Sequence, residues 1–288
     1  MPKKARNIFQ PTSPPETVAG NPLNGKSSWL TWNPQARTVL EKFRKEAMAL
    51  RDPQIIRLLG GVEYDRTYSV SLEAVLQLEC YKELSVLATE LRKVDPGDKI
   101  LFFRDLLDEN FTGEHLHKLF ATLRDIIANL ADNVMGALYA PLSYVGRSAG
   151  DFPLHSDLYI PRHLWNVFER VPRDGSGSPI FLPTSTFREL LDQCHVPSNA
   201  KTLLLNCLDD EAATDRFQSF YDLLYVEQSD WSDRLTGAMQ ARQIPLRLDY
   251  GQAYLLNDRK WLHGRLAPSG GVTTKRVHRL VFAPNQSL

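Results

Sequence analysis

The sequence predicts an α+β protein in which helices come first and a mainly β core follows. Apolar residues recur at helical spacing over residues 37–50, 72–91 and 116–130. Beyond Met135, short apolar or alternating runs are separated by Gly, Pro, Ser and Asp, a texture typical of a β-sandwich. Hydrophobic residues make up 43% of the 288 and charged residues 24%, so the chain can bury a sizeable core. We therefore expect helices packed outside a β-sandwich.

The order of these patterns predicts one domain preceded by an arm. Six prolines fall within the first 34 residues, so residues 1–35 are predicted to form a flexible N-terminal arm. Residues 36–288 then form a single domain, with 36–135 as mainly helical support and 136–288 as the β core, interrupted by a helical insertion around 186–235. Candidate strands are 137–145, 152–160, 164–171, 179–182, 244–248, 252–256 and 277–282.

Charge and cysteine content exclude several classes of protein. The 34 Lys and Arg balance the 34 Asp and Glu, so no net field favours nucleic acid or an anionic membrane. No uncharged apolar run reaches the roughly 18 residues of a membrane span, and no apolar stretch follows the basic N-terminus as in a signal peptide. Cys80, Cys194 and Cys207 are odd in number and scattered, as in a reducing compartment. We expect a cytoplasmic protein that binds neither nucleic acid nor membrane.

Two histidines and an aspartate form the main candidate site. In His155-Ser156-Asp157 the first and third side chains share one face if the segment is a strand. His263 follows 106 positions after Asp157, just beyond a candidate strand, and would complete the set if the sheet folds back. Two histidines and one carboxylate with open positions opposite are the ligand set of non-haem Fe(II) oxygenases. The sequence therefore predicts a metal site formed by His155, Asp157 and His263.

A basic strand lies downstream of the second histidine. Arg276 and Arg279 follow His263 by 13 and 16 positions, and a guanidinium there can bind a remote carboxylate through two parallel hydrogen bonds. Residues three apart on a regular strand face opposite ways, so Arg276 shares a face with His278 and Arg279 faces the other side. Either arginine remains a candidate for binding a cosubstrate.

These motifs together resemble a known family of oxygenases. His155-x-Asp157, then His263-Gly264-Arg265, then Arg276 or Arg279 is similar to the Fe(II)/2-oxoglutarate-dependent dioxygenase superfamily. The His-Gly-Arg triplet with a later basic strand resembles its taurine dioxygenase and clavaminate synthase branch. The resemblance covers about residues 150–284.

The resemblance implies a fold, a set of cofactors and a reaction. The fold would be a double-stranded β-helix, a cupin-like jelly roll, with the helical N-terminal half packed outside and the helical insertion as a lid. His155, Asp157 and His263 would hold Fe(II), and Arg276 or Arg279 would bind the far carboxylate of 2-oxoglutarate. The reaction would consume O2 and 2-oxoglutarate, release succinate and CO2, and hydroxylate an unactivated C–H bond. The substrate would be a small molecule, amino-acid-derived or carboxylated.

Some residues leave alternatives open. The branch supplies a threonine to the cosubstrate from a Gly-Gly-x-Thr turn, whereas this chain has Ser178-Pro179 near that place, with Thr184 as the other candidate. His163 is a rival metal ligand, although Pro161 separates it from the motif. Asn166 and Arg170 share strand parity and could line a substrate pocket or lie on a sandwich surface.

Two other functions remain compatible with the motifs. A protein or peptide hydroxylase of the same superfamily would have an open groove where a small-molecule enzyme has a lidded pocket. A cupin-like binding protein would keep the barrel without redox chemistry. The apolar surface of the helical half could cover the barrel or form a homodimer.

Overall fold

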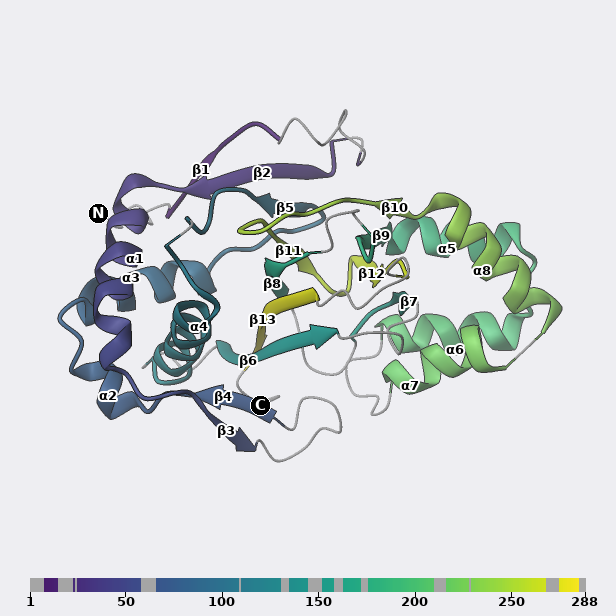
Figure 1. Cartoon of the computed structure of the whole chain (residues 1–288). Coiled ribbons are helices and arrows are strands. Elements are labelled where there is room, and N and C mark those ends of the chain that lie inside the picture. Colours follow the sequence, from purple (N-terminus) through teal and green to yellow (C-terminus); the bar gives the residue numbers. More distant parts are fainter. Residues whose placement is uncertain are drawn as a thin grey trace, which may run out of the picture.

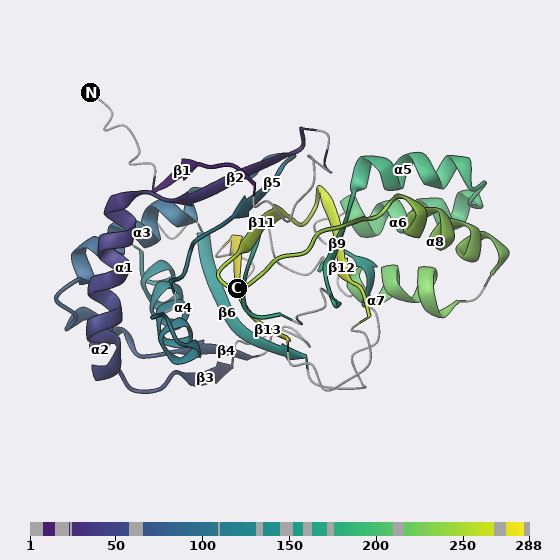
Figure 2. The same cartoon turned by 45° about the horizontal axis from the view of Figure 1, so that its top comes forward.

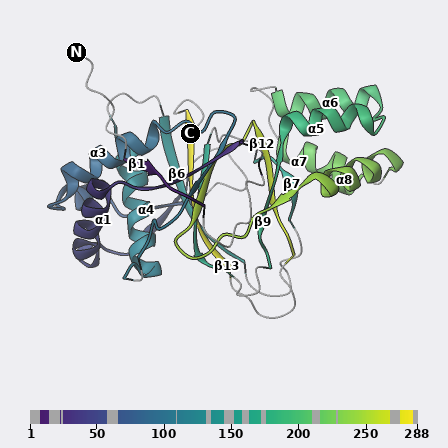
Figure 3. The ribbon, with the colours of Figure 1, turned by 90° about the horizontal axis from the view of Figure 1, so that it is seen from above.

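The chain folds into four layers, with two β-sheets in the middle and helices on both outer sides (Figure 3). In this computed structural model the described residues are 8–14, 23, 25–57, 66–108, 110–130, 135–144, 152–157, 163–171, 176–209, 216–227, 229–267 and 275–284. The fold is therefore a mixed α+β fold, as the sequence predicts.

The larger sheet has seven strands (Figure 1). Their order is β1 (Phe9–Pro11), β2 (Ser27–Trp32), β5 (Ile100–Phe103), β11 (Ala253–Asn257), β8 (His163–Arg170), β13 (Lys275–Pro284) and β6 (Met135–Tyr144). The β2–β5 pair is parallel and the other pairs are antiparallel. Strands close to the N-terminus and close to the C-terminus therefore share one sheet.

The smaller sheet has four antiparallel strands and faces the larger one. Their order is β10 (Ile244–Pro245), β9 (Pro179–Pro183), β12 (Trp261–Arg265) and β7 (Phe152–His155). Side chains from both sheets fill the space between them, among them Phe102 and Tyr254 from the larger sheet and Phe181 from the smaller. A separate hairpin pairs β3 (Gln54–Arg57) with β4 (Arg66–Ser69).

One group of helices covers the outer face of the seven-stranded sheet (Figure 2). It comprises α1 (Pro34–Glu46), the 3-10 turn η1 (Ala47–Ala49), α2 (Leu72–Leu76), α3 (Tyr81–Arg92) and α4 (Gly113–Ala128). Helix α1 begins where the sequence favours it, because Asn33 accepts a hydrogen bond from the Ala36 amide and Pro34 stands in the first turn. Helix α4 packs Phe120 against Tyr139 and Trp165 of the sheet.

A second group of helices packs on the outer face of the four-stranded sheet. It comprises α5 (Thr184–Gln193), α6 (Ser198–Asp209), α7 (Arg216–Tyr221), the π-helical turn η3 (Asp222–Val226) and α8 (Asp230–Arg242). Their apolar residues, such as Phe187, Phe220 and Leu235, contact Leu154 and Leu262 of the sheet. The segment predicted as a helical insertion is thus helical over its described residues, and it covers the back of this sheet.

The structure corrects three expectations about the elements. Residues 1–35 do not form only a flexible arm, since β1 and β2 pair within the larger sheet. Residues 36–135 contribute β5 to that sheet as well as helices, so this part of the chain is not only a helical support outside the β core. β12, the strand that carries His263, is not among the candidate strands, although His263 does follow the predicted strand that forms β11. Short strands are hard to predict because tertiary pairing, not local pattern, stabilises them.

The described residues contain no helix long and apolar enough to span a bilayer. Cys80, Cys194 and Cys207 are buried, and none of the three forms a disulfide bond. Burial raises the pKa of Cys80 to about 12, with the nearby Glu46 carboxylate as a second cause.

A buried chain of hydrogen bonds links helix α4 to the back of the large sheet. The Tyr139 hydroxyl lies 2.8 Å from His117 Nδ1 and 2.7 Å from His278 Nδ1, and His278 Nε2 lies 2.7 Å from Glu169 Oε2. Tyr139 and His278 are fully buried. Burial, together with the positive charge of neighbouring basic groups, lowers the pKa of His117 to about 4. His117 is therefore neutral in the folded protein at pH 7.

Acidification should destabilise the protein through this chain. An unfolded histidine titrates near pH 6.5, so between about pH 6.5 and pH 4 the unfolded state binds more protons and the free energy of unfolding falls. We expect His117→Gln to remove roughly 2 kcal/mol of that fall in denaturant titrations between pH 7 and pH 4. His115→Gln, at a more exposed helix cap, should remove less; equal slopes in wild type and His117→Gln would contradict this assignment.

Candidate metal centre

The two histidines of the predicted motif meet across neighbouring antiparallel strands. His155 ends β7 and His263 lies in the middle of β12, and the two residues are direct partners in the register of this pair. Directly opposed residues project to the same face of a sheet. The two ring centroids are accordingly 4.5 Å apart, on the face that points to the large sheet.

The glycine that follows His263 is required by the approach of β7. A Cβ atom at Gly264 would lie 2.5 Å from the Phe152 carbonyl oxygen and 2.9 Å from that of Pro153. The register of the pair also shifts between His263 and Arg265. Only glycine allows the two backbones to come this close, so the glycine of the His-Gly-Arg triplet has a physical role beside the histidine.

Asp157 lies two residues beyond the end of β7 and completes the cluster. His155 Nε2 is 3.3 Å from Asp157 Oδ1, and His263 Nε2 is 3.7 Å from Asp157 Oδ2. The three residues are buried and offer ligand atoms that all lie within 4.8 Å of one another. For metal–ligand bonds near 2.1 Å, adjacent ligands stand about 3 Å apart. The spacing and the donor set both fit a divalent transition metal.

The electrostatics of the cluster suit metal ligands. Burial lowers the pKa of His155, and the nearby charge of His263 lowers it further, so the imidazole is neutral. Burial would raise the pKa of Asp157, but Arg279 and the two imidazoles hold it well below its usual range. A neutral imidazole and an ionised carboxylate are the forms that bind a metal.

A second buried carboxylate adjoins the cluster, and the sequence analysis missed it. Asp258 Oδ1 is 3.1 Å from His263 Nε2, and Asp258 is fully buried although it lies in the turn between β11 and β12. Ser156, between two of the predicted ligands, donates its hydroxyl to Asp258 Oδ2 at 2.7 Å. The sequence gives one weak indication of this contact. Asp258 is a charged residue only five positions before His263.

The two candidate arginines lie on opposite faces of β13. Arg279 points between the sheets, where Nη1 donates to Asp157 Oδ2 at 2.7 Å and Nε donates to Asn166 Oδ1 at 3.0 Å. Arg276 points to the outer face, where Nε lies 3.1 Å from Glu169 Oε2. The structure thus brings Arg279, and not Arg276, to the histidine–aspartate cluster.

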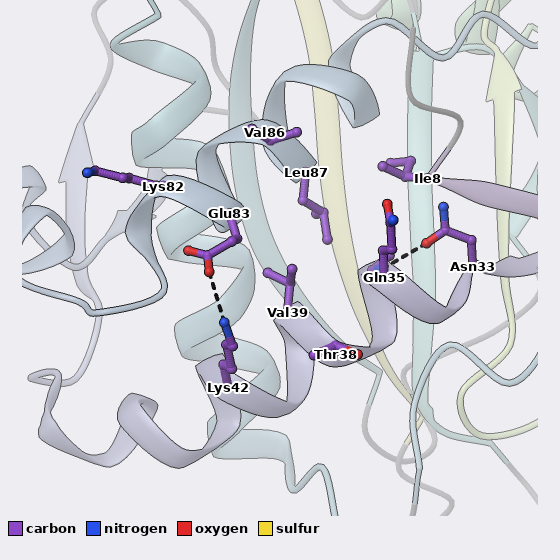
Figure 4. A pocket seen from close by; sticks show the side chains of 11 residues that line it. Ile8, Asn33, Gln35, Thr38, Val39, Lys42, Lys82, Glu83, Val86 and Leu87 are labelled. Carbon is purple, nitrogen blue, oxygen red and sulfur yellow. Dashed lines mark hydrogen bonds and ion pairs between the residues drawn. The ribbon is translucent and has the colours of Figure 1, made fainter.

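The cluster borders a small cavity between the two sheets. The cavity has a volume of about 30 Å³ and is lined by the two histidines together with Phe152, Asn166, Phe168, Pro179, Tyr254, Gly264, Arg265, Val277 and Arg279. A larger groove, of about 440 Å³, lies between α1 and α3, where Lys42 and Glu83 form an ion pair across it (Figure 4). That groove contains none of the predicted site residues.

The other candidates from the sequence lie away from the cluster. His163 Nε2 is 3.4 Å from Asp95 Oδ1, and His163 is not part of the group of converging ligands. Thr184 donates to the Arg259 carbonyl, and neither Thr184 nor Ser178 lines the cavity. Arg170 is largely exposed, whereas Asn166 is buried in the cavity wall.

Comparison with known proteins gives matches among solved structures only. No family model and no curated protein matches the chain. Asparagine oxygenase in complex with Fe(II), 2S,3S-3-hydroxyasparagine and succinate matches with a TM-score of 0.46 and 12% identity, over 88% of this chain and 92% of that chain. Non-heme iron oxygenase OrfP in complex with Fe, succinate and (3S)-hydroxy-L-Arg matches with a TM-score of 0.47 and 16% identity, over 87% and 93%.

These similarities are distant. Both matched proteins are oxygenases in complex with iron. In its buried His155–Asp157–His263 cluster the chain resembles the Fe(II)/2-oxoglutarate-dependent dioxygenases, as predicted.

Metal titration tests the cluster directly. Metal-free protein should bind one equivalent of Co(II), detected by its visible absorption, and Asp157→Ala should abolish this binding because it removes a ligand. Asp258→Asn should weaken it far less than Asp157→Ala does, because Asp258 contacts the His263 imidazole but is not one of the three converging ligands. Asp125→Asn, another buried carboxylate that accepts from the Val70 amide far from the cluster, should bind as wild type. Full binding by Asp157→Ala would rule out this site.

Proposed function

We propose that this chain is an Fe(II)- and 2-oxoglutarate-dependent oxygenase that hydroxylates an unactivated C–H bond of a small molecule. The observation that carries the proposal is the buried set of two histidines and one carboxylate between the two sheets, with ligand atoms within 4.8 Å of one another. This donor set, with open positions on the opposite side, is characteristic of such oxygenases. We propose His155, Asp157 and His263 as the three ligands of Fe(II).

The proposal includes the fold and its extent. We infer that the seven-stranded and four-stranded sheets together correspond to the double-stranded β-helix of the superfamily, a cupin-like jelly roll. Residues 36–288 would form one oxygenase domain, extended N-terminally by β1 and β2. The helices around 186–235 would act as a lid through the end of α7, since Tyr221 stacks on Phe152, which itself contacts His155.

Iron held by these residues would supply the chemistry of O2 activation, in which 2-oxoglutarate, O2 and a C–H bond yield succinate, CO2 and an alcohol. The protein's own residues would orient the reactants. Phe168 and Tyr254 belong to the hydrophobic core between the sheets and also line the cavity. They would exclude water from that part of the cavity wall. A dry, shaped cavity is what the protein contributes in such sites.

Arg279 is our candidate for binding the far carboxylate of 2-oxoglutarate. Its side chain is 13% exposed, lines the cavity and contacts the cluster through Asp157, whereas Arg276 is paired with Glu169 on the opposite face. A guanidinium donates two parallel hydrogen bonds to a carboxylate. Arg279 would therefore exchange its contact with Asp157 for the incoming acid.

A small, carboxylated or amino-acid-derived substrate fits the polar character of the cavity. Arg265 and Arg279 both line it, so the wall offers more than one cation for anionic groups. Because the cavity lies between the two sheets and is lined by cations, we propose a small molecule as substrate in preference to a peptide, which needs an open groove.

Anaerobic spectroscopy tests the proposed function. Fe(II) is added to metal-free protein, 2-oxoglutarate is titrated in, and the weak visible charge-transfer absorption of a chelated 2-oxoacid should appear. Arg279→Ala should raise the required 2-oxoglutarate concentration by roughly 10- to 100-fold, because charge-assisted hydrogen bonds are lost. Arg276→Ala, the matched control on the opposite face, should behave as wild type. Absence of the absorption in wild-type protein that retains iron would exclude 2-oxoglutarate.

A further inference from the structure

One side chain in the cavity wall has a hydrogen-bond donor without a partner. Asn166 lies in the middle of β8, is 1% exposed and lines the cavity next to the cluster. Its Nδ2 group is buried and has no hydrogen-bond partner among the described residues. Leaving a buried amide donor unpaired costs about 1–3 kcal/mol. Such groups in folded proteins call for an explanation, and a ligand that accepts a hydrogen bond is one.

The other end of the same amide is occupied by the arginine of the cavity. Asn166 Oδ1 accepts from Arg279 Nε at 3.0 Å, and residues 166 and 279 are direct partners between β8 and β13. The amide is thereby held with Oδ1 toward the guanidinium and Nδ2 on its other side. Because Asn166 and Arg279 line the same cavity, an acid bound there by Arg279 lies beside an amide whose Nδ2 is available as a second donor.

The donors around the cavity suit an anion. Arg265, Arg279 and Asn166 all line it, and the carboxylate of the cluster, Asp157, is already paired with Arg279. Ser178, just before β9, and Thr184, at the start of α5, do not supply a donor here, since neither lines the cavity. Asn166 offers a donor from a different strand.

We propose that Asn166 is a specificity-determining residue for the acid cosubstrate, donating its Nδ2 hydrogen to the carboxylate that Arg279 binds. This inference rests on the proposed function, because it assigns Asn166 to the far carboxylate of 2-oxoglutarate. Through Oδ1 the same side chain positions the guanidinium. The Asn166 amide thus orients Arg279 through Oδ1 and offers a neutral hydrogen-bond donor, Nδ2, beside the guanidinium.

Equilibrium binding of two acids to the iron-loaded protein tests the proposal without turnover. The probes are 2-oxoglutarate and 2-oxopentanoate, which has the same chain length but lacks the far carboxylate; both are titrated anaerobically and followed by calorimetry and by the charge-transfer absorption. Wild type should prefer 2-oxoglutarate strongly. Asn166→Ala should weaken 2-oxoglutarate binding roughly tenfold or more and leave 2-oxopentanoate binding unchanged.

Two further variants separate the donor from the positioning role. Asn166→Asp keeps an oxygen for Arg279 Nε but replaces the donor with a negative group, so it should weaken 2-oxoglutarate binding more than Asn166→Ala does. Asn166→Thr restores a hydroxyl donor and should recover part of the affinity. Asn129→Ala, whose Nδ2 already donates to the Asp125 carbonyl at the end of α4, is the control and should match wild type.

The outcomes distinguish the two claims. If wild type prefers 2-oxoglutarate and Arg279→Ala loses that preference, while all Asn166 variants bind as wild type, the inference about Asn166 is wrong and the proposed function stands. If the Asn166 variants lose both acids equally, their effect is structural and the inference is again wrong. If iron-loaded wild type binds neither acid, the proposed function fails and the inference fails with it.

Discussion

The site depends on one cross-strand pair, His155 opposite His263 in the antiparallel ladder of β7 and β12. This pairing fixes which faces the two imidazoles share, because a slip of one residue would turn either histidine to the helical side of the sheet. Gly264 makes the pair possible by letting the β7 backbone approach to a distance that a Cβ atom would prevent. Asp157 lies only two residues after His155, so its carboxylate reaches the two imidazoles without a further strand.

The second constraint is electrostatic and acts between the sheets. Asp157 belongs to the smaller sheet's edge and Arg279 to the larger sheet, and their ion pair of 2.7 Å joins the two across the cavity. A buried carboxylate without a partner would be costly, so the guanidinium stabilises the ionised form that a metal requires. Ser156 and Asp258 add a second buried connection, from the turn after β11 to His263. The cluster is thus held by polar contacts from the larger sheet and from the turn after β11.

Side chains alternate between the two faces along β8 and β13, so the two faces of the large sheet carry different polar groups. Asn166 and Arg279 point inward to the cavity, while Glu169 and His278 point outward beneath α4. The outer hydrogen-bond chain runs from the half-buried His117 through the fully buried Tyr139 and His278, and it ties α4 to the large sheet. The inward residues are therefore carried on strands whose other face is anchored by packing and by paired polar groups, which restricts the movement of the cavity wall.

The sequence by itself determined the α+β class, most of the later strands and the three cluster residues, because strand alternation and the His-x-Asp spacing are local properties of the chain. It also showed that Arg276 and Arg279 face opposite ways, but not which of them faces the cavity. Only the tertiary structure decided that, since the pairing of β13 with β8 sets the inward face. The strands β2 and β5, the buried Asp258 and the unpaired Asn166 donor likewise became visible only after distant segments met, because each is defined by partners far away in sequence.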